Sequence, residues 1–289
     1  MAFSRPVTEI IKLRSSQRTY TAQPIEAKAA QSLKDALDNP PTPPFGGSVR
    51  VALLEAFDAE KRGVKKLGTY GFIKGAKNYL VGVVDDGEHA MQNFGYVFEW
   101  AVLNATDLEL ATCWVGGTLK RGAFAKAVEA SSKQIIPAVS PVGYSPKKRR
   151  VFDSAVCFMA GSKKRKPFEE LFFDGDFSTA LSEQSAGQYT TVLEMVRLGP
   201  SASNRQPWRI VKQAGVDNFH LFVQRTKGYH KMTSVDLQKI DMGIAMCHFE
   251  LTAAESGLAG DWQFEPPGNY ELPERTEFMA SWIAASQAK

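Results

Sequence analysis

The feature that most constrains the fold is a similarity between two long apolar segments that lie 148 residues apart in the 289-residue chain. Both segments are apolar on more than one face, which is typical of a helix buried at the centre of a protein. We therefore predict an internal duplication in which each half supplies one long core helix that ends before a tryptophan. The aligned pairs are Gly95 with Gly243, Leu103 with Leu251, Ala105 with Ala253, Asp107 with Glu255, Leu110 with Leu258, Ala111 with Ala259 and Trp114 with Trp262.

A second similarity, at a shift of 160 residues, aligns residues 33–40 with residues 193–200. Each stretch has the pattern of a short helix closed by proline, and a loop and a β-type run follow it, at 49–54 or 209–212. Since helices and strands interleave, we predict an α+β fold, an α/β/α sandwich, with halves 1–175 and 176–289 intertwined as an internally duplicated pseudo-dimer. In the first half we expect helices over residues 7–13, 27–37 and 92–110, and strands over 49–55, 79–84 and 151–160.

The composition is that of a soluble globular protein, with 44% apolar and 23% charged residues. No apolar run approaches the roughly 18 residues of a membrane-spanning helix, and the N-terminus has no apolar stretch of the signal-peptide type. The three cysteines are scattered, and no cysteine or histidine pair has metal-ligand spacing. We therefore expect a cytoplasmic protein without a metal site. We also expect His248, in an apolar helical stretch, to be packed and hydrogen-bonded rather than catalytic.

Two basic runs, residues 147–150 and 163–166, carry much of the excess behind the net charge of +4. Such runs are usually solvated surface, and they can also bind nucleic acid non-specifically. Here they flank one apolar strand candidate, residues 151–160, which is more typical of a pocket wall than of a nucleic-acid groove. No nucleic-acid motif accompanies them, so we expect no nucleic-acid partner and no membrane partner.

Several short motifs carry the chemistry, beginning with residues 14–18 (Arg-Ser-Ser-Gln-Arg), which Tyr20 and a Pro-Ile helix start at 24–25 follow. Taken singly they are weak, because arginines near a helix end often only complement the helix dipole and Ser/Asn loops are often only turns. The others are 111–117 (Ala-Thr-Cys-Trp-Val-Gly-Gly), 141–144 (Pro-Val-Gly-Tyr), 165–171 (Arg-Lys-Pro-Phe-Glu-Glu-Leu) and 200–208 (Pro-Ser-Ala-Ser-Asn-Arg-Gln-Pro-Trp). Together the motifs resemble the FMN-dependent nitroreductase superfamily, and the repeat resembles the subgroup in which two such domains are fused.

The resemblance implies a non-covalently bound FMN and a role for each motif. Residues 14–16 and the basic residues near 165 match the phosphate and ribityl contacts, and Arg18 matches a cation at the flavin's pyrimidine edge, where reduction builds negative charge. Residues 115–117 match a turn whose backbone approaches the ring, which glycine permits. Residues 200–204 match a loop that the partner subunit supplies in dimeric relatives. The implied FMN-binding residues are Arg14, Ser15, Ser16, Arg18, Val115, Gly116, Gly117, Lys163, Arg165, Pro200, Ser201, Ala202, Ser203 and Asn204.

The repeat predicts one flavin site per chain rather than two. A shift of 160 places the polar loop 201–206 on residues 41–46, Pro-Thr-Pro-Pro-Phe-Gly, where most side-chain donors are missing. The same shift places residues 14–18 on residues 174–178, where Asp174 and Asp176 would repel a phosphate. We therefore expect one FMN between the two halves, in a chain that is a monomer or a homodimer.

The resemblance also implies an oxidoreductase in which NAD(P)H reduces FMN and a small electron-poor acceptor then takes the electrons in a ping-pong cycle. The flavin supplies the chemistry in such enzymes, and we nominate no catalytic side chain. The alternatives are a flavin-binding protein with little turnover, a relative that binds no FMN, and a nucleic-acid or surface-binding protein. The sequence leaves open the acceptor and the choice between NADH and NADPH.

Overall fold

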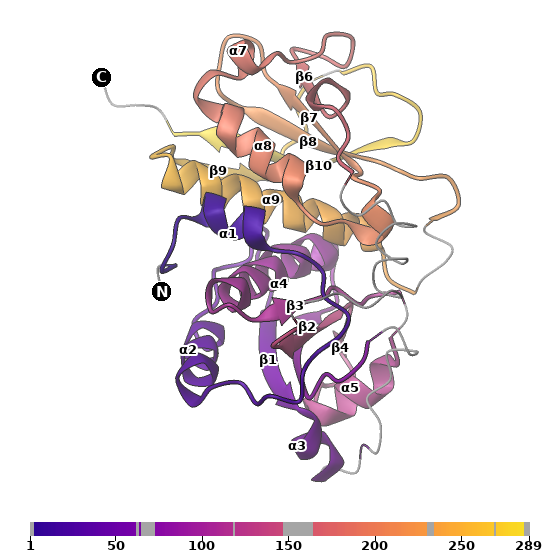
Figure 1. Cartoon of the computed structure of the whole chain (residues 1–289). Coiled ribbons are helices and arrows are strands. Elements are labelled where there is room, and N and C mark those ends of the chain that lie inside the picture. Colours follow the sequence, from indigo (N-terminus) through magenta and orange to yellow (C-terminus); the bar gives the residue numbers. More distant parts are fainter. Residues whose placement is uncertain are drawn as a thin grey trace.

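The computed structural model describes residues 3–61, 64, 73–117, 119–146, 164–229, 234–268 and 270–285. Figure 1 shows two sheets on either side of two long helices, α4 (Ala90–Asp107) and α9 (Leu237–Glu255). Both helices are buried on nearly every face, as their apolar sequences predict. One hydrophobic core therefore runs from the first sheet through the two helices to the second sheet.

The first sheet is antiparallel and has the strand order β1-β2-β5-β3, with β4 paired to β2 beside this path. Its central strand β2 is buried on both faces, because α4 packs on one face and a second apolar cluster around α5 (Arg121–Ala127) packs on the other. The strands are β1 (Val49–Glu55), β2 (Asn78–Asp85), β3 (Ala111–Thr112), β4 (Gln134–Ile135) and β5 (Val139–Gly143).

The second sheet has the order β6-β7-β8-β10-β9, and its last four strands repeat the order of the first sheet. Those four are antiparallel, whereas β6 pairs with β7 in parallel. β6 belongs to the half predicted over residues 1–175, so the first half contributes a strand to the second sheet. The strands are β6 (Phe172–Asp174), β7 (Trp208–Lys212), β8 (Phe219–Gln224), β9 (Gly260–Gln263) and β10 (Thr276–Ala284).

The central helices cross where a glycine from each meets the backbone of the other. A Cβ on Gly95 would collide with the Ile240 carbonyl oxygen and lie 3.1 Å from Cα of Gly243. A Cβ on Gly243 would collide with the Gln92 carbonyl oxygen and lie 2.8 Å from the Tyr96 nitrogen. Gly95 and Gln92 correspond to Gly243 and Ile240 at the shift of 148 residues. The crossing is therefore reciprocal, as at an interface with two-fold symmetry, and it supports the predicted duplication.

The shorter helices cover the sheets and the central pair. Helix α1 packs against α4, α8 and α9, and the backbone N–H groups of Val7 and Thr8 at its start donate to the Glu255 carboxylate at the end of α9. This contact fixes the place from which the chain leaves α1. The α-helices are α1 (Val7–Leu13), α2 (Ala27–Leu37), α3 (Ala56–Lys61), α7 (Glu183–Ala186) and α8 (Thr190–Leu198), and the 3-10 turns are η1 (Phe168–Glu170), η2 (Gly187–Tyr189) and η3 (Ala202–Asn204).

The predicted elements of the first half are confirmed, apart from small shifts in two of them. The bounds of α1, α2 and β1 agree with the prediction, and β2 is one residue longer at each end. The long helix starts two residues earlier than predicted and ends three residues earlier, at Asp107. It ends there because Glu109 takes a left-handed conformation, with φ of 61°, which the apolar pattern does not reveal. The predicted strand 151–160 lies outside the described residues.

Candidate functional site

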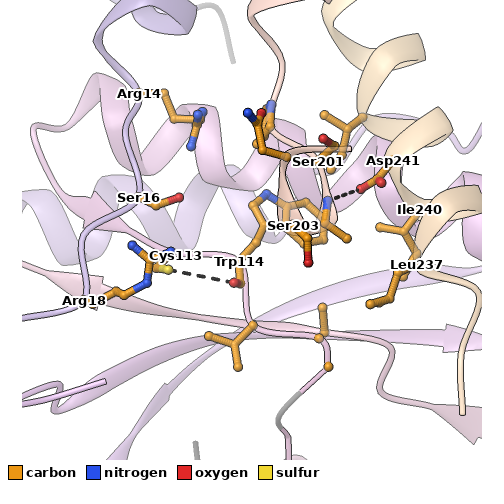
Figure 2. A pocket seen from close by; sticks show the side chains of 18 of the residues that line it. Arg14, Ser16, Arg18, Cys113, Trp114, Ser201, Ser203, Leu237, Ile240 and Asp241 are labelled. Atoms are coloured by element: carbon orange, nitrogen blue, oxygen red, sulfur yellow. Dashed lines mark hydrogen bonds between the residues drawn. The ribbon is translucent and has the colours of Figure 1, made fainter. Parts of the chain in front are cut away.

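A cavity of about 360 Å³ lies where residues 14–18, the turn after β3, the loop before β7 and the start of α9 meet. Figure 2 shows Arg14, Ser16 and Arg18 along one side, with Leu237, Ile240 and Asp241 on the opposite side. All predicted site residues line it except Ser15 and Lys163, and Lys163 lies outside the described residues. The predicted residues that line it are Arg14, Ser16, Arg18, Val115, Gly116, Gly117, Arg165, Pro200, Ser201, Ala202, Ser203 and Asn204.

The chain after α1 runs extended along β3, which explains why alternate residues face the cavity. Ser16 forms a parallel bridge with Thr112, and the Gln17 N–H donates to the Thr112 carbonyl oxygen at 2.9 Å. In extended backbone, successive side chains point to opposite sides. Arg14, Ser16 and Arg18 therefore share one side, and the exposed Ser15 faces away, where its hydroxyl accepts from Gln17 Nε2 at 3.0 Å.

Two guanidinium groups gather at one end of the cavity. The side chain of Arg14 is only 7% exposed, and its Nε is buried without a hydrogen-bond partner among the described residues. Burial, together with the positive charges of Arg14 and Arg197, lowers the pKa of Arg165 to about 10. Arg197 is paired with Glu194. Burying like charges together is unfavourable unless an anion compensates them, so this end has the character of an anion site.

The loop before β7 covers the cavity in a strained conformation. Ser203, Asn204 and Gln206 are all left-handed, with φ of 51°, 53° and 49°, at a cost of roughly 1 kcal/mol or more for each non-glycine residue. Hydrogen bonds fix this loop on both sides. The Ala202 N–H donates to Asp241 Oδ1 at 2.9 Å, and Asn204 Nδ2 donates to the Lys164 carbonyl oxygen at 2.9 Å. Such strain persists where the surroundings enforce it, as at ligand sites.

The remaining wall of the cavity consists of apolar side chains and a glycine turn. Gly116 lies so close to α9 that a Cβ on it would be 2.9 Å from Leu237 Cδ2. The Gly116 carbonyl oxygen accepts from Arg121 Nη2 at 2.7 Å, and Val115 is paired with Val139 through both backbone groups. The turn is therefore rigid. The other residues of this wall are Ile73, Ala138, Ile240 and Ile244.

Sequence reasoning missed the wall that α9 contributes, and Asp241 is its polar member. This carboxyl is 2% exposed, and its Oδ2 is buried without a hydrogen-bond partner among the described residues. Burial raises the pKa of Asp241 well above its usual range, although the bond from the Ala202 N–H opposes this. An aspartate inside an otherwise apolar helix was the available signal. The other lining residues outside the prediction are Ile73, Cys113, Trp114, Ala138, Tyr229, Leu237, Ile240 and Ile244.

The structure contradicts the alignment that placed residues 14–18 on residues 174–178, because the two segments pair with strands that do not correspond. Ser16 bridges to Thr112 of β3, whereas Asp174 is the last residue of β6 and pairs with Lys212 of β7. The two segments therefore occupy different places in their sheets. The carboxylates of Asp174 and Asp176 give no reason for a missing second site.

Aromatic rings from both halves lie at the place that corresponds to the cavity wall by the internal repeat. At the shift of 148 residues, Gly116 corresponds to Phe264 and Leu237 to His89. The rings of Phe264 and His89 lie 4.3 Å apart between centroids, and Phe45 lies 5.0 Å from His89 and 5.9 Å from Phe264. Where a glycine and a leucine line the cavity, ring side chains contact one another at the corresponding place.

The family model that matches most of the chain gives the class of the protein, an α+β oxidoreductase of the nitroreductase type. The chain belongs to the family described as "Putative TM nitroreductase", whose model matches residues 6–253. Among curated proteins, no relative matches the chain.

Solved structures are similar over the whole chain or over half of it. A "putative nitroreductase" from Thermotoga maritima has 18% identity and a TM-score of 0.59, and the match covers 98% of this chain and 95% of that chain. A nitroreductase with bound FMN from Bacteroides fragilis has 17% identity and a TM-score of 0.41, over 51% of this chain and 92% of that chain. The Thermotoga similarity confirms the predicted α+β nitroreductase fold.

The described residues lack two kinds of feature. None of their helices has the length and apolar character needed to cross a membrane. They also contain no group of three or more His, Cys, Asp or Glu side chains that could hold a metal ion.

Proposed function

We propose that this chain is an FMN-dependent oxidoreductase that passes electrons from NAD(P)H to a small electron-poor acceptor. The observation that carries the proposal is the pair of guanidinium groups, the buried Arg14 and the half-buried Arg165, at one end of a cavity of about 360 Å³. A phosphomonoester carries about −1.5 to −2 charges and several strong acceptor oxygens. It would compensate the positive charge at this end and accept from Arg14 Nε, which has no hydrogen-bond partner among the described residues.

The rest of the cavity fits the rest of FMN. Ser16 lies next to the cationic end along the extended segment and can donate to the phosphate or the ribityl chain. The apolar wall of Ile240, Ile244 and the turn at Gly116 suits one face of a flat ring system. Arg18 would stabilise negative charge at the flavin's pyrimidine edge. Bound FMN would supply hydride acceptance and electron release, and the protein would supply position and electrostatics.

The size of this cavity supports a ping-pong order. If a flavin fills most of a space this small, the electron donor and the acceptor would use the same remaining access to the ring in turn. The family description supports a small electron-poor molecule as the class of acceptor.

We also propose one flavin per chain, in a protein that acts as a monomer or a homodimer. The support is the ring cluster of Phe45, His89 and Phe264, which lies at the place that corresponds to the cavity by the internal repeat. The Asp241 position also differs between the halves, since its counterpart at the shift of 148 residues is Asn93.

Anaerobic titration of the FMN-loaded protein with NADH and, separately, with NADPH tests the enzyme assignment. We expect at least one donor to abolish the visible flavin absorbance, and a quinone or nitroaromatic compound to restore it. Unchanged absorbance with both donors, in protein that does bind FMN, would favour a flavin-binding protein with little turnover. Protein that takes up no FMN would refute the proposal.

A further inference from the structure

A buried cluster of polar side chains lies directly behind Arg14. Glu99 of α4 is 0% exposed, and its Oε1 lies 2.9 Å from His248 Nε2 and 3.9 Å from Arg14 Nε. Its Oε2 accepts from Trp114 Nε1 at 2.7 Å. Arg14 and Trp114 both line the cavity (Figure 2). Glu99 therefore contacts two wall residues of the cavity without lining it.

His248 of α9 completes the cluster and is also fully buried. Its Nδ1 lies 2.9 Å from the Met195 carbonyl oxygen. A carbonyl oxygen only accepts, so Nδ1 must carry a hydrogen. The contact between Nε2 and Glu99 Oε1 then needs one more proton, because otherwise two lone pairs would face each other. The Glu99–His248 pair thus holds one proton between its two atoms and has no net charge.

The surroundings place that proton on His248. Glu99 accepts from Trp114 and lies beside the Arg14 cation, and both contacts stabilise a carboxylate. The pair is therefore a carboxylate with an imidazolium. Since the imidazolium compensates Glu99, the charge of Arg14 stays available to a ligand in the cavity.

We propose that the buried Glu99–His248 ion pair positions Arg14 for a phosphomonoester dianion, so that it sets the preference of the cavity for a phosphorylated flavin. The proposal rests on the proposed function. Glu99 holds the Arg14 side chain in its buried place, and His248 keeps Glu99 from cancelling the Arg14 charge. Neither residue contacts the ligand, so both are positioning residues. Glu99 comes from the first half and His248 from the second, so the two halves form the phosphate end together.

Riboflavin is FMN without the phosphate. Comparing the binding of the two ligands therefore tests whether Glu99 and His248 position Arg14 or only stabilise the structure in general. Dissociation constants for both ligands are measured by flavin fluorescence on apoprotein of the wild type, Glu99→Gln and His248→Gln. We expect either variant to weaken FMN binding by about tenfold or more, the loss of one hydrogen bond to a charged group. Riboflavin binding should change by about twofold or less.

The matched control is His220→Gln, which removes a buried histidine that bonds Ser281 at 2.8 Å in the second sheet, away from the cavity. It should leave the ratio of the two dissociation constants unchanged. Equal weakening of FMN and riboflavin in Glu99→Gln and His248→Gln, or no weakening of either, would overturn the proposal.

A second measurement needs no flavin. The ¹⁵N spectrum of the imidazole rings, assigned by the signals missing in His248→Gln, should show both ring nitrogens of His248 carrying hydrogen at neutral pH. A neutral ring at that position would overturn the inference. Failure of the wild type to bind any flavin would count against the proposed function alone.

Discussion

At the scale of single residues, Asp241 and Asn93 occupy corresponding positions in the two halves and make the same kind of backbone contact. Asp241 accepts from the Ala202 N–H at 2.9 Å, and Asn93 accepts from the Phe45 N–H at 3.1 Å. Each therefore fixes the loop before the first antiparallel strand of its sheet. The Asn93 amide also donates to the Gly46 carbonyl oxygen at 2.7 Å, whereas Asp241 has a buried oxygen at the cavity with no hydrogen-bond partner among the described residues. The cavity thus has an acid at this position, and the place with the ring cluster has an amide.

Asp241→Asn should make stability less sensitive to pH. Burial raises the pKa of Asp241, so the folded state favours the neutral carboxyl. Its contribution to stability is therefore complete below the unfolded pKa of about 4 and is lost as pH rises through the raised pKa. An asparagine stays neutral and can keep the bond from Ala202. Ligand-free Asp241→Asn should melt about 2 °C or more above the wild type at pH 9, and the gap should shrink towards pH 4. A gap that grows on acidification would contradict the assignment.

The sequence predicted the side of the cavity that local spacing determines. Alternation along residues 14–18 brings Arg14, Ser16 and Arg18 together whatever the rest of the chain does, although naming Ser15 beside them neglected that alternation. The α9 wall could not be predicted in this way. Whether Asp241 or the residue that follows it faces the cavity depends on how α9 is rotated against α4, which the glycine contacts decide.

At the scale of elements, the α4–α9 crossing sets the positions of the two sheets that pack against these helices. The helices approach so closely because Gly95 and Gly243 present no side chain to each other's backbone. Gly243 lies next to the wall residue Ile244 and about one turn from Ile240, so a change in helix separation would move the cavity wall directly.

Gly243→Ala should destabilise the protein by at least about 2 kcal/mol, because the new methyl group would collide with the Gln92 carbonyl oxygen and two rigid helices would have to part. The matched control is Gly122→Ala in α5, where a Cβ meets nothing within 4 Å. Alanine there should be neutral or stabilise the helix by roughly 0.5 to 1 kcal/mol. Urea denaturation of both variants measures the difference. Equal stabilities for the two variants would show that the crossing tolerates a methyl group.

Element boundaries followed the sequence wherever the apolar pattern and the chain geometry agreed. α1, α2 and β1 have the predicted bounds because a proline or a polar loop delimits them. The sequence analysis placed the end of α4 too late. The helix ends near the left-handed Glu109, and no glycine or proline in the sequence marks that position. The pairing of β6 with the second sheet could not be predicted from the sequence either, because a strand of three residues is too short to show a periodic apolar pattern.

At the scale of the whole molecule, the two sheets have the same strand order around reciprocal helices, yet a cavity with buried cations lies on one side. The duplication stays a prediction that these observations support. If it is right, one ancestral ligand site persists, and the rings of Phe45, His89 and Phe264 have replaced the other.

The purified protein saturated with FMN should therefore contain one flavin per chain. The ratio is measured by flavin absorbance after release from protein of known concentration. A ratio near two would show that the ring cluster opens to admit a second ligand. A ratio near one that persists in Phe264→Ala would show that ring removal alone does not restore a site.

The parallel pairing of β6 with β7 has a consequence for the order in which the chain is made. β6 leaves the ribosome before α8, β7 and β8, so the strand is complete while the sheet it belongs to is still being synthesised. Phe172 of β6 is fully buried in the finished protein, and until β7 emerges it has no sheet to cover it. A nascent or truncated chain ending shortly after residue 175 would thus expose an apolar strand with open edges, which favours aggregation. This strand is therefore exposed to aggregation from its own synthesis until β7 has been made.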